Sequence, residues 1–142
     1  LNGKWIANTN FQEQITTVNW VEATQRVGDL NTIAQLTFHV LYYLKGILPV
    51  FDGGQLEIKD QFSFDMPAIT QEAEWLALVS EFISVAEQFC DRVEEMDDDQ
   101  LEQPFVKEAY GTFQRNIEAQ IEHSYYHLGQ VSLVKKLVIA NK

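Results

Sequence analysis

The chain has 142 residues, 46% of them hydrophobic, and this size and composition indicate one globular domain over residues 1–142. The formal charge is −11 and the only paired basic residues near the C-terminus are Lys135 and Lys136, which argues against binding to nucleic acid or an anionic membrane. No apolar run approaches the roughly 20 residues that span a bilayer, so we expect no membrane segment.

The first two helical segments differ in clarity. Residues 4–25 keep no clean apolar period, and we expect a short helix with irregular turns there. The second segment begins with a capping box of Thr32 and Gln35, and its apolar residues then recur at helical spacing. Gly46 is a candidate close-packing point. Pro49 and the Gly53–Gly54 pair are expected to end this helix.

Residues 52–68 form a long connection with little periodicity, which predicts either a functional lid or a simple crossover between distant helix ends. The third helix is expected to start at Thr70 as N-cap and to stop at the acidic run 97–99. That run lacks the ligand pattern of a calcium loop and is interpreted as a solvated helix cap. A fourth helix is predicted over residues 108–139. Together these elements predict an all-α fold, a four-helix bundle with one long connection between helices two and three.

Cys90 is the single cysteine, so no intrachain disulfide can form, and a reducing cytoplasmic location is expected. It falls in the apolar pattern of the third helix. We interpret it as a small buried hydrophobic residue, with a catalytic thiol as the alternative.

The three histidines of the chain are the main functional candidates. On a helix that turns 100° per residue, His123 and His127 share a polar stripe with Gln120 and Gln130, beside the apolar core face. Glu118 and Glu122 point away from this stripe, so any carboxylate ligand would come from another segment. An isolated pair of histidines four residues apart is common on helices. It is by itself weak evidence for a metal site.

The second helix repeats this arrangement, because His39 and Tyr43 share a stripe that borders its apolar face. If the two helices are neighbours, His39, His123 and His127 can meet. Three imidazoles leave a coordination position open, as in catalytic zinc sites, although nickel, copper and iron also suit such ligands. Gln130, Gln120 and Tyr43 are then candidates for holding a ligand nitrogen or a bound water. The alternative is three ordinary hydrogen-bonded histidines.

The segments NTIAQLTFHVLYYLKGI and NIEAQIEHSYYHLGQVSLVKKL resemble the DinB-like superfamily, also called the DinB/YfiT metalloproteins, from about Thr32 onward. The resemblance implies an up-down-down-up four-helix bundle, a dimer, and a divalent metal, zinc or nickel, on His39, His123 and His127. The segment before Thr32 is shorter and more irregular than the usual first helix of that family. The family's DNA-damage-inducible label does not imply DNA binding.

Two functions follow from these observations. The first is a metal-dependent transferase that adds a low-molecular-weight thiol to an electrophilic small molecule. The second is a non-catalytic metal-binding or interaction protein in which the metal braces the bundle. The exposed positions expected for aromatic residues such as Tyr125 and Tyr126 support a homodimer in either case. The sequence assigns no catalytic residue and no fourth ligand.

Overall fold

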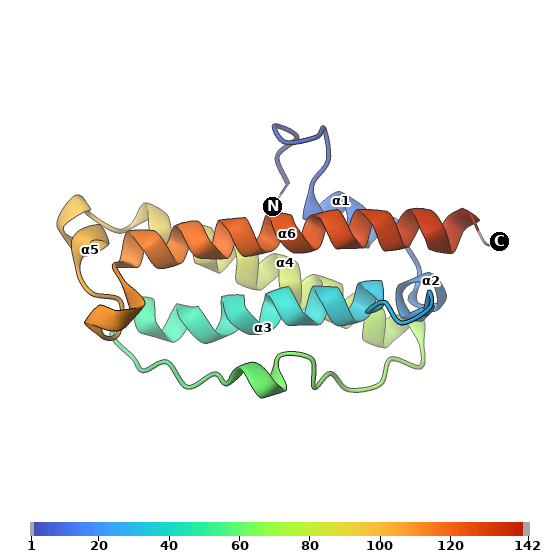
Figure 1. The fold of residues 1–142 in the computed structure, drawn as a ribbon, viewed down its shortest axis with the longest axis horizontal. Helices are drawn as coiled ribbons and strands as arrows, with labels where there is room; N and C mark the ends of the chain where they lie inside the picture. The colour runs from blue at the N-terminus through green and yellow to red at the C-terminus, as the bar shows by residue number, and fades with distance from the viewer. Residues whose placement is uncertain (1, 141–142) are drawn as a thin grey trace.

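Three long helices dominate the computed structural model, which describes residues 2–140 (Figure 1). The α-helices are α1 (Phe11–Thr16), α2 (Trp20–Thr24), α3 (Ile33–Phe51), α4 (Glu72–Glu94), α5 (Asp98–Glu102) and α6 (Phe113–Ala140), with 3-10 turns at Asp60–Phe62 and Glu108–Tyr110. Within the described range there is no strand, only an isolated bridge between Pro104 and Thr112. The predicted all-α class is confirmed. The order of four long helices stays a prediction, because α1 and α2 are short.

Residues 4–25 contain two short helices rather than one. Asn10 caps α1 by accepting a hydrogen bond from the Glu13 amide, and Asn19 forms a capping box with Glu22 at the start of α2. The loop between these helices is anchored to α4, because the indole Nε1 of buried Trp75 donates to the Val18 carbonyl over 3.0 Å. The apolar residues of this segment keep no single period because the segment forms two short helices, each with its own N-cap.

The capping box of Thr32 and Gln35 is confirmed at the start of α3. The sequence predicted that Pro49 helps to end this helix, but Pro49 lies inside its last turn. The chain leaves the helix at Gly53, whose φ of +82° is in the left-handed region that glycine adopts without strain. The α4 N-cap is Gln71 and not Thr70, because Glu74 reaches back to accept hydrogen bonds from the Thr70 amide and hydroxyl.

The acidic run begins a helix of its own. Asp97 accepts a hydrogen bond from the Gln100 amide and caps α5, so the predicted capping role is present but serves the next helix. The last long helix starts at Phe113, later than residue 108, because Gly111 has a φ of +75° and interrupts the helical path.

The long connection lies along α3 (Figure 1). The Tyr42 hydroxyl donates to the Lys59 carbonyl and accepts from its amide, and the Tyr43 hydroxyl donates to Asp60. A Cβ at Gly46 would overlap the Ile58 side chain, which confirms Gly46 as a close-packing point. The connection is therefore held in place beside the face of α3 that carries His39.

The core forms where α3 packs against both α4 and α6, with α1 packed against α4 and against the C-terminal half of α6 (Figure 1). None of the helices described here combines the length and the hydropathy that crossing a bilayer requires. The side-by-side placement of α3 and α6 is what positions the histidines.

Candidate metal centre

His39 on α3 and His123 and His127 on α6 come together in one cluster. Their candidate ligand nitrogens all lie within 4.8 Å of one another, and Nε2 of His123 is 3.1 Å from Nε2 of His39. The side chains of His39 and His127 are buried, at 8% and 7% exposure, and His123 is half-buried. The convergence expected from two polar stripes is therefore present.

Two of the imidazoles are oriented by acceptors on their Nδ1 side. His39 Nδ1 lies 3.3 Å from the Ser63 carbonyl oxygen, and His127 Nδ1 lies 2.6 Å from Gln130 Oε1. An oxygen acceptor there favours the tautomer with the proton on Nδ1, which leaves the Nε2 lone pair free for a metal. The interaction with Gln130 is the one expected of a residue that supports a ligand.

The electrostatics also suit metal binding. Burial lowers the pKa of all three histidines, and the proximity of His127 and His39 helps lower that of His123 to about 4. All three rings are thus neutral near pH 7 and can offer a lone pair without first losing a proton.

The cluster fits a divalent metal by its geometry and its donor set. Tetrahedral zinc with bonds of about 2.0–2.1 Å places its ligand nitrogens about 3.3 Å apart, close to the 3.1 Å between His39 and His123. Among the described residues no carboxylate or thiol joins the three histidines. Three protein ligands would leave a position for water or a substrate.

The wall of the site comes from the long connection. The Phe64 ring stacks on His39 with 4.0 Å between centroids, and Ser63 is buried beside it. Tyr43 presents its ring edge-on, 5.1 Å from His39 and 5.0 Å from His123. Ser63 and Phe64 were not identified from the sequence, because a loop without periodicity carries no signal of where its side chains point.

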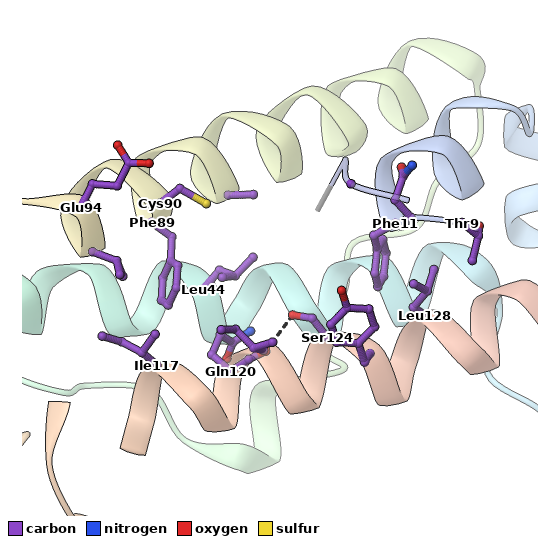
Figure 2. A pocket seen from close by; sticks show the side chains of 16 residues that line it. Thr9, Phe11, Leu44, Phe89, Cys90, Glu94, Ile117, Gln120, Ser124 and Leu128 are labelled. Carbon is purple, nitrogen blue, oxygen red and sulfur yellow. Dashed lines mark hydrogen bonds between the residues drawn. The ribbon is translucent and has the colours of Figure 1, made fainter. Parts of the chain in front are cut away.

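Gln120 lies apart from these contacts. It is buried, lines a groove between α4 and α6 with Leu44 and Phe89, and its Nε2 has no hydrogen-bond partner among the described residues. Its role as a support for the metal centre stays a prediction. Cys90 lines the same groove and is exposed, so the expected burial of this thiol is wrong. It stands at the edge of the apolar stripe of α4 (Figure 2), where none of the helices between residues 2 and 140 covers it.

We expect Gln130→Ala to weaken metal binding by about 10- to 100-fold, because His127 loses the acceptor that fixes its ring and tautomer. Competition with a chromogenic chelator measures the change. Gln130→Glu, which keeps an acceptor oxygen, should bind more tightly than Gln130→Ala. Gln114→Ala is the control, since that amide contacts Glu118 on the exposed side of α6. Equal affinity of Gln130→Ala and the wild type would remove Gln130 from the site.

The metal-free protein should lose stability as the pH falls from about 6.5 to about 4. In the unfolded protein the histidines have ordinary pKa values near 6.5. In the folded protein their pKa values are lowered, and that of His123 is about 4. Within this pH window the unfolded state therefore binds more protons than the folded state, so stability falls as the pH falls. Stability is therefore greatest above the unfolded pKa. Urea unfolding at about pH 7 and about pH 5 measures the loss. It should be smaller in His123→Gln, and equal losses in the two proteins would show that His123 does not contribute.

The sequence model of the DinB superfamily matches residues 12–131. This range contains α2, α3, α4 and α5 entirely and includes all three histidines of the cluster. Comparisons with curated proteins and with solved structures found no match. Because the family match extends over most of the 142 residues, the chain belongs to the DinB superfamily.

Proposed function

We propose that the protein is a metal-dependent thiol transferase, with zinc or nickel on His39, His123 and His127. The observation that carries this proposal is a cluster of three neutral imidazoles from two helices with no carboxylate in the group. A divalent cation held there would lower the pKa of a coordinated thiol and keep it as the thiolate. The open position is where a low-molecular-weight thiol would enter.

The reaction would transfer the thiol sulfur to an electrophilic carbon. The S–H proton is lost to solvent, a C–S bond forms, and the bond from carbon to the leaving group breaks with its electron pair going to that group. A halide departs as the anion, whereas the oxygen of an opened epoxide stays attached and takes a proton from solvent. Phe64 and Tyr43 form an aromatic wall next to His39, and such a wall suits an apolar electrophile and limits access of water. We therefore expect the electrophile to be small and largely apolar, so that it can lie against these two rings.

The test uses protein purified without a histidine tag and loaded with zinc or nickel. It is assayed with glutathione, cysteine and bacillithiol as thiols and with chlorodinitrobenzene or an epoxide as electrophiles. The expected result is thiol-dependent turnover that is lost with a chelator and in His123→Ala. Metal binding without turnover on the whole panel would contradict the transferase. Protein that neither carries nor binds a metal would contradict metal chemistry altogether.

The second candidate is a non-catalytic protein in which the metal braces the bundle. The observation in its favour is that His39 comes from α3 while His123 and His127 come from α6, so one ion would link two long helices. In this case metal removal should lower the melting temperature sharply, and thiols should not compete for the ion. A thiol that alters the absorption spectrum of a cobalt-substituted site would favour the transferase instead.

We also propose a homodimer in the cytoplasm. Tyr126 and Leu133 share one side of α6, with 66% and 55% of their surface exposed, and apolar pairs of this kind favour an interface. The lone thiol of Cys90 suits a reducing compartment. Light scattering at micromolar concentration should give twice the monomer mass for the wild type and less for Leu133→Lys. A monomeric wild type would contradict the dimer.

A further inference from the structure

The long connection contacts α3 along one side of that helix (Figure 1). We call residues 56–64 of this connection the strap. The α3 residues that contact the strap are His39, Tyr42, Tyr43 and Gly46. They are three, four and seven positions apart, so they share one side of the helix. The strap therefore lies on the same side of α3 that supplies a histidine to the candidate metal centre.

One end of the strap orients His39. The Ser63 carbonyl oxygen is 3.3 Å from His39 Nδ1, and the Phe64 ring stacks on the imidazole with 11° between the two planes. A carbonyl oxygen can only accept, so this contact favours the proton on Nδ1 and directs the Nε2 lone pair toward the other two histidines. Because the acceptor belongs to the backbone, its position depends on where the strap lies and not on the side chain of residue 63.

The strap is fastened to α3 two helical turns away from His39. The Tyr42 hydroxyl donates to the Lys59 carbonyl and accepts from the Lys59 amide, both over 2.9 Å. The Ile58 side chain occupies the space where a Cβ on Gly46 would lie. Gly46 is about 10 Å from His39 along the helix, and neither Gly46 nor Ile58 belongs to the histidine cluster. These contacts fix the strap without touching the metal ligands.

Little apolar surface holds the strap in place. Between residues 52 and 68 only Ser63 is buried, while Leu56, Ile58 and Met66 are half-buried and the other residues are exposed. A segment with few buried contacts and exposed backbone hydrogen bonds can detach while the rest of a domain stays folded. The few contacts with Tyr42, Tyr43 and Gly46 therefore decide what fraction of the molecules has the strap docked.

We propose that the strap is a detachable positioning element, and that its docking on α3 through Gly46, Ile58 and Tyr42 sets the affinity of the metal centre. When the strap detaches, His39 loses the Ser63 carbonyl and the Phe64 ring, and this side of the centre is uncovered. A metal that binds the docked state more tightly shifts the strap toward docking, and docking raises metal affinity by the same factor. The proposal rests on the metal centre of the proposed function but not on thiol transfer.

Hydrogen exchange of the Lys59 amide measures docking, because this amide donates to the Tyr42 hydroxyl. Tag-free protein is compared by NMR with and without saturating zinc. Zinc should slow exchange at Lys59 by about tenfold, within the usual range of coupling between two sites. The Gln100 amide, which is bonded to Asp97 in α5, is the internal reference and should not change. No slowing at Lys59, or equal slowing of both amides, would overturn the proposal.

Gly46→Ala places a methyl group against Ile58 and should lower zinc affinity about tenfold, as expected when a ligand loses its hydrogen-bond partner. Alanine favours a helix more than glycine does, so the melting temperature of the metal-free protein should not fall. Adding Ile58→Ala removes the overlap and should restore zinc affinity. Gly129→Ala is the matched control on α6, where an added Cβ has no atom within 4 Å, and it should leave affinity unchanged.

Tyr42→Phe frees the strap in a second way, because it removes both hydrogen bonds to Lys59. It should also lower zinc affinity, whereas Tyr125→Phe, the same change at a half-exposed residue of α6, should not. Equal zinc affinity of these two variants would overturn the proposal. So would a Gly46→Ala protein that binds zinc as the wild type does while its Lys59 amide exchanges faster.

The outcomes separate the strap from the proposed transferase. Zinc that slows exchange at Lys59 in a protein without thiol transfer would support the strap and contradict the transferase. Thiol transfer by a protein in which zinc does not affect Lys59 would do the reverse. A protein that binds no zinc or nickel would contradict both.

Discussion

Replacing His39, His123 or His127 by alanine is expected to lower metal affinity by more than about 100-fold. This exceeds the loss of about 10- to 100-fold that follows removal of a residue that only hydrogen-bonds to a ligand. The reason is that the three imidazoles are the only His, Cys, Asp or Glu side chains that meet at this point among the described residues. With one removed, two protein ligands remain and water must fill the vacated position. Calorimetric titration of tag-free protein with zinc and with nickel measures the effect.

The same titration carries its own controls. Gln114→Ala changes an exposed side chain on α6 and should leave the affinity unchanged. His39→Ala is the most informative variant, because His39 comes from α3 and its loss removes the link between the two helices. If His39→Ala binds metal as the wild type does, the ion is held by His123 and His127 alone, and the three-histidine centre is wrong.

Replacing Trp75 by alanine is expected to lower the free energy of unfolding by about 3–5 kcal/mol, a large part of the total stability of a domain of this size. Trp75 is completely buried, and its Nε1 donates to the Val18 carbonyl, so it joins α4 to the segment between α1 and α2. The substitution removes a large apolar side chain and leaves the Val18 carbonyl without this donor. Urea unfolding of the metal-free protein, followed by circular dichroism, gives the value.

Two further tryptophan variants separate packing from hydrogen bonding. Trp75→Phe keeps most of the buried ring but loses the donor to Val18, and should cost about 1–3 kcal/mol. Trp5→Ala removes an indole that is 94% exposed and should change stability by less than about 0.5 kcal/mol. A Trp75→Ala protein as stable as Trp5→Ala would mean that the N-terminal segment does not pack on α4.

The features that the sequence predicted correctly are local in origin. The capping box of Thr32 and Gln35 depends on residues three apart, and a helix turns by a known angle, so His123 and His127 had to share one side of α6. Local rules predicted two helix ends incorrectly, the start of α4 and the end of α3. Glu74 reaches back to Thr70 and shifts the α4 N-cap to Gln71, and Pro49 is accommodated within the last turn of α3.

Contacts between distant segments were decided only by the tertiary structure. His39 meets the α6 histidines because α3 and α6 pack side by side. The Nε2 atoms of His39 and His123 lie 3.1 Å apart although the two residues are 84 positions apart along the chain. Ser63 and Phe64 reach His39 because the connection is held against α3 by Tyr42 and Tyr43. Periodicity along a helix states which side chains share a face, but not which neighbour covers that face. For this reason the residues predicted that His123 and His127 share one face, whereas their meeting with His39, the exposure of Cys90 and the groove beside it depend on how the helices are packed.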